Sequence, residues 1–281
     1  MIDLHSHTLH SDGDRSPAEL FSEARAAGVK VLSVTDHDTV FGLQECRDAS
    51  EAAGVRFVPG IELSCELHGR EVHVLGHFID PGAPALERLA TDMLAERRER
   101  MERMVGLAQD QGFTAVTMER VLAASGGENL GRPHLARALV DCGHAVSIKD
   151  AFDRFLKTGG ALWVDRRRLP ARDAIDLVHD AGGTATIAHP GANAVSRQEL
   201  SVLAGDGLDG VEAWHPEHPP NQVDAFVRWA DELGLVVTAG SDYHGPTVQP
   251  DRKLGDRTLP PERFAALEAR AAARRSARPR T

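Results

Sequence analysis

Short apolar runs that end in a histidine, an aspartate or a glutamate recur along this 281-residue chain. The runs that we predict as buried strands cover residues 1–4, 31–34, 56–59, 71–75, 183–188, 210–214 and 235–239. Helix-like stretches, among them residues 16–27, 44–53 and 171–181, lie between many of them. This alternation predicts an α/β fold with a mostly parallel sheet or barrel. The carboxyl ends of parallel barrel strands meet on one face, so we expect the polar residues to gather there.

The middle of the chain follows a different pattern. Residues 84–160 contain no strand-like run and are rich in helix-forming residues, with glycines at positions 126, 127 and 131 as breaks. We therefore predict a helical insertion of residues 84–160 in a discontinuous barrel of residues 1–83 and 161–259. Residues 260–281 read as a C-terminal helix with a basic tail, for which a solvated end is a better interpretation than a nucleic-acid contact.

Composition excludes several classes of protein. The formal net charge of −10 argues against stable binding to duplex nucleic acid, although metal ions would let an acidic protein bind a phosphorylated substrate. No apolar run is long enough to span a membrane, and the first residues do not resemble a signal peptide. The three cysteines lack CxxC spacing, which argues against a disulfide framework or a thiolate zinc site. We expect a cytoplasmic protein that does not bind membranes.

The first two motifs combine imidazoles with carboxylates. His5 and His7 are two residues apart in an extended run, so both imidazoles can point to one face, and Asp12 follows shortly after. His37 lies between two aspartates, Asp36 and Asp38, one of which would orient its ring. Alone, each motif could equally be structural.

Further candidates follow later runs. Glu62 comes after the run at 56–59, and either His73 or His77 in the next run could face the same site. Arg132 and His134 lie at a helix start, where a guanidinium suits a phosphate.

Two more runs, 183–188 and 235–239, lead to His189 and to the pair Asp242 and His244. The candidate ligands number about nine, more than the four to six that one ion takes, which indicates two or three ions. Imidazole and carboxylate without thiolate suit Mn²⁺, Zn²⁺ or Fe²⁺. A structural role is the better interpretation for His10, His68, His144 and His179.

The segments HSHTLHSDG, TDHD, PGIE, EVHVLG, GRPHLA, AHP and GSDYHG occur in this order and closely resemble the motifs of the PHP (polymerase and histidinol phosphatase) family. The resemblance extends from His5 to about Gly245. The helical middle resembles the branch of nucleoside 3′,5′-bisphosphate phosphatases and 5′→3′ exonucleases. This resemblance implies a distorted (β/α)₇ TIM-like barrel, a helical insertion that roofs the site, and a trinuclear metal centre.

The resemblance also implies a role for each matching position. One metal would take His5, His7, Glu62 and Asp242; a second would share Glu62 and add His73 and His134; a third would take Asp12, His37 and His244. In this scheme His73, and not His77, is the ligand. Arg132 and His189 would bind the phosphate, and His37 would help to stabilise the leaving oxygen. For His215 and His218 a structural role in their loop is the better interpretation.

We therefore expect a phosphoesterase that hydrolyses a phosphate monoester through a metal-bound hydroxide. The leading substrate is the 3′-phosphate of a nucleoside 3′,5′-bisphosphate, with three divalent ions per chain and Mn²⁺ as the first choice. Alternatives are a 5′→3′ exonuclease on short 5′-phosphorylated oligonucleotides, a histidinol phosphatase, and a non-catalytic metal-binding interaction module. The sequence does not indicate an oligomeric state.

Overall fold

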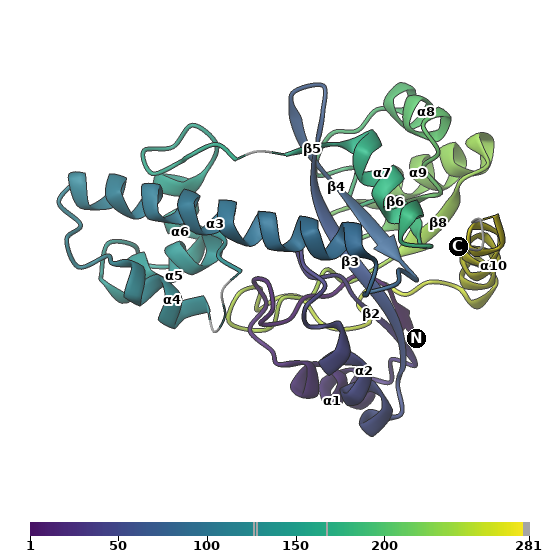
Figure 1. Cartoon of the computed structure of the whole chain (residues 1–281), viewed down its shortest axis with the longest axis horizontal. Helices are drawn as coiled ribbons and strands as arrows, with labels where there is room; N and C mark the ends of the chain where they lie inside the picture. Colours follow the sequence, from purple (N-terminus) through teal and green to yellow (C-terminus); the bar gives the residue numbers. More distant parts are fainter. Residues whose placement is uncertain (126, 128, 167, 278–281) are drawn as a thin grey trace.

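One sheet curls into a nearly closed barrel in the computed structural model, which describes residues 1–125, 127, 129–166 and 168–277 (Figure 1). The strands follow one another in the order β1 (Ile2–Asp3), β2 (Val31–Val34), β3 (Arg56–Leu67), β4 (Arg70–His77), β6 (Thr184–Ile187), β7 (Gly210–Trp214) and β8 (Val236–Ala239), while β5 (Leu169–Pro170) pairs with β3 beside this path. The first and last strands approach each other, because the amide of Leu4 donates to the carbonyl of Ala239 at 3.0 Å. The expected barrel class is confirmed.

One strand runs against the others. Strands β1, β2 and β3 are parallel, as are β6, β7 and β8, but β4 is antiparallel to both of its neighbours, β3 and β6. The reversal comes from a tight turn in which His68 (φ 50°) and Gly69 (φ 76°) both have left-handed backbones. The strand expected at 56–59 therefore continues through Glu62 to Leu67, so Glu62 lies inside a paired strand instead of after a strand end, while His73 lies inside a strand as expected.

Helices cover the outside of the barrel. They are α1 (Pro17–Ala27), α2 (Leu43–Ala53), α7 (Ala171–Asp180), α8 (Arg197–Gly205), α9 (Pro220–Leu233) and α10 (Pro261–Ala277). Helix α1 begins as its sequence predicts, since Ser16 and Glu19 form a capping box and Pro17 occupies the first turn. Buried side chains such as Leu63, Ile175 and Val211 fill the space between sheet and helices. No helix of the described chain is both long and apolar enough to span a membrane.

A second group of helices forms a lobe beside the barrel (Figure 1). It comprises α3 (Pro84–Asp110), α4 (Met118–Ser125), α5 (Arg132–Asp141), α6 (Ile148–Ala151) and the π-helix η1 (Phe152–Leu156). Met104, Leu135 and Leu139 belong to a separate apolar cluster within this lobe. We propose that residues 84–160 form an insertion whose helices pack mainly on one another. The end of the basic tail, residues 278–281, lies outside the described residues, as does the expected break at Gly126.

Candidate metal centre

Segments far apart in the sequence bring their polar side chains to one end of the barrel. His5 and His7 follow β1, His37 follows β2, and Asp242 follows β8. Glu62 reaches the same place from within β3. Three groups of ligand-type residues result, in each of which the potential ligand atoms lie within 4.8 Å of one another.

The first group contains His5, His7, Glu62 and Asp242. Glu62 Oε2 lies 3.2 Å from His5 Nε2 and 3.1 Å from His7 Nε2. Asp242 Oδ1 lies 3.3 Å from each of the same two nitrogens. The two imidazoles are fully buried, so two carboxylates and two rings face one small volume that water barely reaches. This is the set expected for the first metal.

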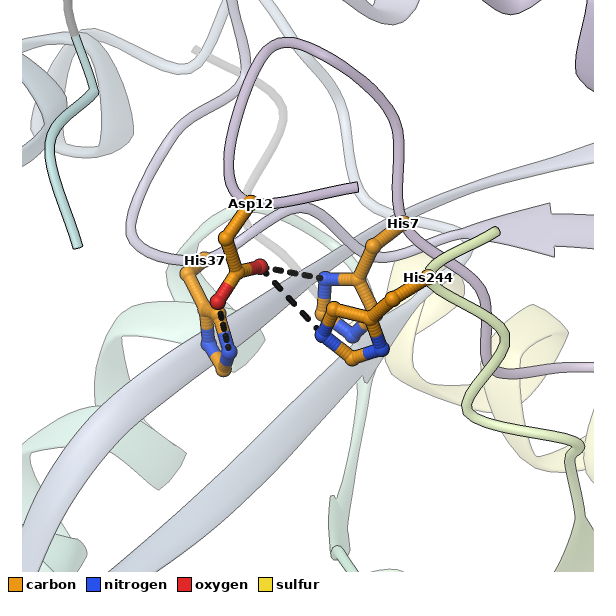
Figure 2. Close-up of side chains that lie close together, drawn as sticks. All are labelled: His7, Asp12, His37 and His244. Atoms are coloured by element: carbon orange, nitrogen blue, oxygen red, sulfur yellow. Dashed lines mark ion pairs between the residues drawn. The ribbon is translucent and has the colours of Figure 1, made fainter. Parts of the chain in front are cut away.

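The second group surrounds Asp12, as Figure 2 shows. Asp12 Oδ1 lies 3.3 Å from His244 Nε2 and 3.8 Å from His7 Nδ1, and Asp12 Oδ2 lies 3.8 Å from His37 Nε2. The rings of His7 and His244 stack with centroids 4.0 Å apart. The expected trio of Asp12, His37 and His244 is therefore together, with His7 as a fourth member.

The third group contains His37, Glu62 and His73. Glu62 Oε1 lies 2.7 Å from His73 Nδ1, and Glu62 Oε2 lies 3.3 Å from His37 Nδ1. One carboxylate thus serves two groups, which is the arrangement of a bridging ligand.

His134 is not a member of this third group, where the resemblance placed it. Its Nδ1 accepts the N–H of Gly131 at 3.0 Å, which closes the first turn of α5. The start of α5 lies beside Asp12 instead, and Asp12 and His134 line a common cleft of about 420 Å³. The structure thus places His134 nearer to the second group, and its role as a ligand remains a prediction.

Buried atoms without hydrogen bonds mark where cations would fit. His7 Nε2, His37 Nδ1 and Asp12 Oδ1 are buried and have no hydrogen-bond partner. A buried polar atom left in this state is destabilising unless something binds it. Divalent ions would satisfy all three atoms, and a set of nitrogen and oxygen donors without thiolate fits first-row metals.

The charges of the centre agree with this interpretation. Burial raises the pKa of a carboxyl group, but neighbouring imidazoles hold the pKa values of Asp12, Glu62 and Asp242 well below their usual range. Burial alone would lower the pKa of His7, yet Asp242 and Glu62 raise it to about 10. For His37 burial dominates and lowers the pKa to about 3. The carboxylates are ionised, as metal binding requires.

Glu212 in β7 supports the centre from behind. Its Oε1 lies 3.0 Å from His5 Nδ1, and its Oε2 accepts the N–H of His189 at 2.8 Å. A carboxylate behind a metal-binding histidine fixes the ring and its tautomer. Glu212 is not among the candidates expected from the sequence, although it is the single acid in the run at 210–214.

Asp36 and Asp38 do not orient His37, so that hypothesis is wrong. Asp36 accepts hydrogen bonds from the N–H of Thr8 at 2.7 Å and from the hydroxyl of Ser11 at 2.5 Å. Asp38 accepts from the N–H and hydroxyl of Ser64 at 2.8 and 2.9 Å, and pairs with Arg97. Both aspartates are buried and tie loops together.

Of the two expected phosphate-binding residues, His189 contacts the third group and Arg132 contacts residues of the helical lobe. His189 follows β6 in a left-handed conformation (φ 27°), and its Nε2 lies 3.0 Å from Glu62 Oε1. Arg132 is half-buried at the start of α5, where it donates to the carbonyl of Leu156 at 3.4 Å and covers the ring of Phe152.

The other histidines of the described chain have structural contacts. His77 is fully buried, its Nε2 lies 2.9 Å from the carbonyl of Leu4, and it belongs to none of the three ligand groups, whereas His73 does. His218 Nε2 accepts the N–H of Gly191 at 3.0 Å. His215 Nε2 lies 3.3 Å from Asp242 Oδ2, where it braces that carboxylate.

The four histidines for which we expected structural roles lie away from the three groups. Three of the rings lie close to an acid: His10 to Glu45, His68 to Glu199, and His179 to Asp209. The ring of His144 stacks on that of Phe113. His68 is exposed and the other three are partly buried.

Several known proteins are similar in sequence to this chain along most of its length. The PHP domain model matches residues 3–119. The 3′,5′-nucleoside bisphosphate phosphatase of Chromobacterium violaceum is 32% identical over 249 residues, which cover 87% of each chain. The 5′-3′ exoribonuclease Rnm of Salmonella typhimurium is 32% identical over 265 residues, which cover 90% of this chain and 89% of that one.

A third relative acts on a different ester. The phosphoribosyl 1,2-cyclic phosphate 1,2-diphosphodiesterase of Eggerthella lenta is 35% identical over 247 residues, 86% of this chain and 94% of that one. Among solved structures, a candidate metal-dependent phosphoesterase from Bifidobacterium adolescentis superimposes with a TM-score of 0.88 at 32% identity, over 95% of each chain.

Proposed function

The chain belongs to the PHP domain family, and from this premise we propose that it removes the 3′-phosphate from a nucleoside 3′,5′-bisphosphate. It is a metal-dependent phosphoesterase by its family and by its candidate metal-binding groups. The choice of a phosphate monoester as substrate is our proposal, because the relatives include an exoribonuclease and a diesterase.

The observation that carries the proposal is the convergence of three ligand groups, two of which share the carboxylate of Glu62 while His7 and His37 link the third to them. We propose three divalent ions per chain, with Mn²⁺ as the first choice. His5, His7, Glu62 and Asp242 would hold one ion; Glu62 and His73 a second; Asp12, His37 and His244 a third. Bound ions of this kind lower the pKa of water from about 15.7 towards 7 and stabilise the charge that builds up on phosphate oxygens.

The side chains of the protein itself bind and orient the substrate. Arg132 would donate to the phosphate oxygens through its planar fork, and His189 would donate through Nε2 from the opposite side. His37 and Asp12 would lie on the side of the leaving oxygen. The nucleoside would occupy the cleft of about 420 Å³ that starts at Asp12 and His134.

A second candidate activity is 5′→3′ exonuclease action on short 5′-phosphorylated oligonucleotides. It is favoured by the Rnm relative, which matches this chain at the same 32% identity as the phosphatase. Either substrate fits an acidic protein that binds small phosphorylated molecules. The cytoplasmic location remains a prediction from the sequence.

One substrate panel tests these proposals. The Mn²⁺-loaded protein is incubated with adenosine 3′,5′-bisphosphate, a 5′-phosphorylated trinucleotide, a ribose 1,2-cyclic phosphate ester and histidinol phosphate. Release of phosphate from the bisphosphate at the highest kcat/KM supports the phosphatase. A higher kcat/KM on another member of the panel assigns that activity instead, and no hydrolysis of any member would favour a non-catalytic module.

A further inference from the structure

The two carboxylate oxygens of Asp242 have different partners. Oδ1 lies 3.3 Å from the rings of His5 and His7 in the first ligand group, whereas Arg252 and His215 bind Oδ2. The backbone of Asp242 is left-handed (φ 51°), a conformation that costs free energy in residues other than glycine and persists where surrounding contacts hold it. The partners of Oδ2 therefore decide how this carboxylate faces the metal centre.

Arg252 is the charged partner of Oδ2. It lies in the loop after β8, and its Nη1 donates both to Asp242 Oδ2 and, at 3.2 Å, to the carbonyl of Asp242. Its Nη2 donates to the carboxylate of Glu217. The side chains of Arg252 and Asp242 are each 12% exposed, so water screens this ion pair only weakly. One guanidinium thus fixes both the carboxylate and the backbone of Asp242.

His215 is the second donor to Oδ2. Its Nδ1 accepts the N–H of Glu217 at 3.2 Å, so the proton of this ring lies on Nε2. Nε2 therefore donates to Asp242 Oδ2, 3.3 Å away, and the ring is buried. With two donors on Oδ2, Oδ1 is the oxygen that is left for a metal ion.

The loop that carries Arg252 is itself anchored. After Arg252, the N–H of Gly255 donates to Asp3 Oδ2 at 2.8 Å, and Leu254 is buried in an apolar cluster of the barrel. Before it, the N–H of Ser241 donates to Asp3 Oδ1 at 2.9 Å. One buried aspartate thus ties together both sides of the loop, and the position of Arg252 is built into the fold.

We propose that Arg252 is a positioning residue, which holds Asp242 so that Oδ1 is its ligand atom for the first metal ion. Glu217 acts through Arg252, because it fixes the other end of the guanidinium. A carboxylate that is already held in place loses less conformational freedom when it binds an ion, and partners behind metal ligands commonly raise the affinity 10- to 100-fold. The inference rests on the proposed function, because it takes Asp242 as a metal ligand.

Metal affinity tests this role directly. Chelator-treated wild type and Arg252→Gln are titrated with Mn²⁺ in a calorimeter, and their metal content is measured by elemental analysis after gel filtration. Arg252→Gln should bind one ion about 10- to 100-fold more weakly and bind the others as the wild type does. Arg252→Lys keeps the charge but not the planar fork, so its affinity should lie between the two, and it serves if the glutamine variant does not fold.

Arg263→Gln is the matched control. Arg263 of α10 forms a pair of hydrogen bonds with Asp231 of α9, outside the metal centre. Its Mn²⁺ affinity should equal that of the wild type. Thermal unfolding of the metal-free proteins provides a further comparison. If Arg252→Gln unfolds at a lower temperature but binds every ion as tightly as the wild type, Arg252 has only a structural role and the inference is wrong.

A double-mutant cycle tests the part assigned to Glu217. The side chain of Glu217 is 51% exposed, so Glu217→Gln should weaken Mn²⁺ binding only about two- to fivefold. The same change should have no further effect in the Arg252→Gln background, because its partner is then already absent. Equal effects in both backgrounds would show that Glu217 does not act through Arg252.

Kinetics separate this inference from the proposed function. With adenosine 3′,5′-bisphosphate, Arg252→Gln should need about 10- to 100-fold more Mn²⁺ for half-maximal activity, and its KM at saturating Mn²⁺ should equal that of the wild type. A raised KM with unchanged Mn²⁺ affinity would mean that Arg252 acts on the substrate, and would overturn the inference. If the wild type does not hydrolyse the bisphosphate but Arg252→Gln still weakens Mn²⁺ binding, the proposed function is wrong and the positioning role stands.

Discussion

At the scale of single residues, the centre depends most on Glu62. This carboxylate is fully buried and its two oxygens lie within 3.3 Å of ring nitrogens from His5, His7, His37 and His73. Among the described residues, no other acid belongs to two of the three ligand groups. Its backbone is held on both sides, since Glu62 pairs with Leu75 of β4 and forms an isolated bridge with His37.

Glu212→Gln tests the carboxylate behind His5. Loss of its charge should weaken metal binding about 10- to 100-fold, because Glu212 fixes the ring of His5 and the backbone of His189. The measurement is a titration of chelator-treated protein with Mn²⁺. Glu268→Gln is the control, since Glu268 is partly exposed and pairs with the exposed Arg56. Equal affinity of Glu212→Gln and wild type would show that Glu212 does not support the centre.

Asp12→Asn tests the second ligand group. Asp12 supplies the only carboxylate of the group that contains His7, His37 and His244, so its loss should remove about one equivalent of metal and leave the others bound. Elemental analysis after gel filtration measures the stoichiometry. A variant that retains the full metal content of the wild type would contradict the proposed ligand set.

At the scale of helices and strands, the sequence predicts where elements lie better than how they run. Six of the seven expected strands match observed ones closely, because apolar runs bounded by turn residues are a local signal. The direction of β4 was not predictable, since alternation of side chains is the same in parallel and antiparallel strands. The continuation of β3 through Pro59 and Gly60 was missed because both residues normally argue against a strand.

In the candidate site, too, the sequence predicts what local patterns carry and misses what only the tertiary structure brings together. The recurrence of ligand-type residues in and after apolar runs indicated a common site, and eight of these residues come together: His5, His7, Asp12, His37, Glu62, His73, Asp242 and His244. Glu212 was not predictable, because acidic residues are usually exposed, whereas this one is fully buried inside a strand. Only the tertiary structure brings Glu217 to Arg252.

The contact between α3 and the barrel depends on a buried ion pair. Arg97 of α3 is 6% exposed and pairs with Asp38, which is 3% exposed. Arg97→Met leaves Asp38 with only Ser64 and a distant Arg166, and should reduce the free energy of unfolding by about 3–5 kcal/mol. Denaturant unfolding measures this value. Arg98→Met, which removes an exposed pair, should change it by less than about 1 kcal/mol; equal effects would rule out a special role for Arg97.

The same pair predicts a dependence of stability on pH. Burial raises the pKa of Asp38, but Arg97 and Arg166 outweigh it and lower the pKa to about 2. A carboxyl group whose pKa is lower in the folded state stabilises the protein above its unfolded pKa, near 3.8, and loses this effect as the pH falls towards 2. The stability difference between wild type and Arg97→Met should therefore be constant from about pH 5 to 8 and narrow below about pH 4. If the stability difference between wild type and Arg97→Met does not narrow at low pH, Asp38 is not the source of that difference.

At the scale of the whole molecule, metal binding and folding are linked. The candidate ligands come from the loops after β1, β2 and β8 and from the β3–β4 hairpin, so ions would crosslink both ends of the sheet. A ligand that binds only the folded state at 100 times its dissociation constant adds about 2.7 kcal/mol. Removal of metal with a chelator should therefore lower the Tm by about 5–10 °C, reversibly on addition of Mn²⁺. Differential scanning calorimetry measures the shift, and an unchanged Tm would mean that the ions do not stabilise the fold.

The meeting of β1 with β8 sets the order of events during synthesis. His5 is synthesised long before Ala239, which accepts the amide of Leu4, and Asp242 and His244 follow later still. A nascent chain therefore exposes His5 and His7 without their Asp242 partner until the last strand has been made. The complete centre can take up its ions only after both ends of the barrel exist and have met.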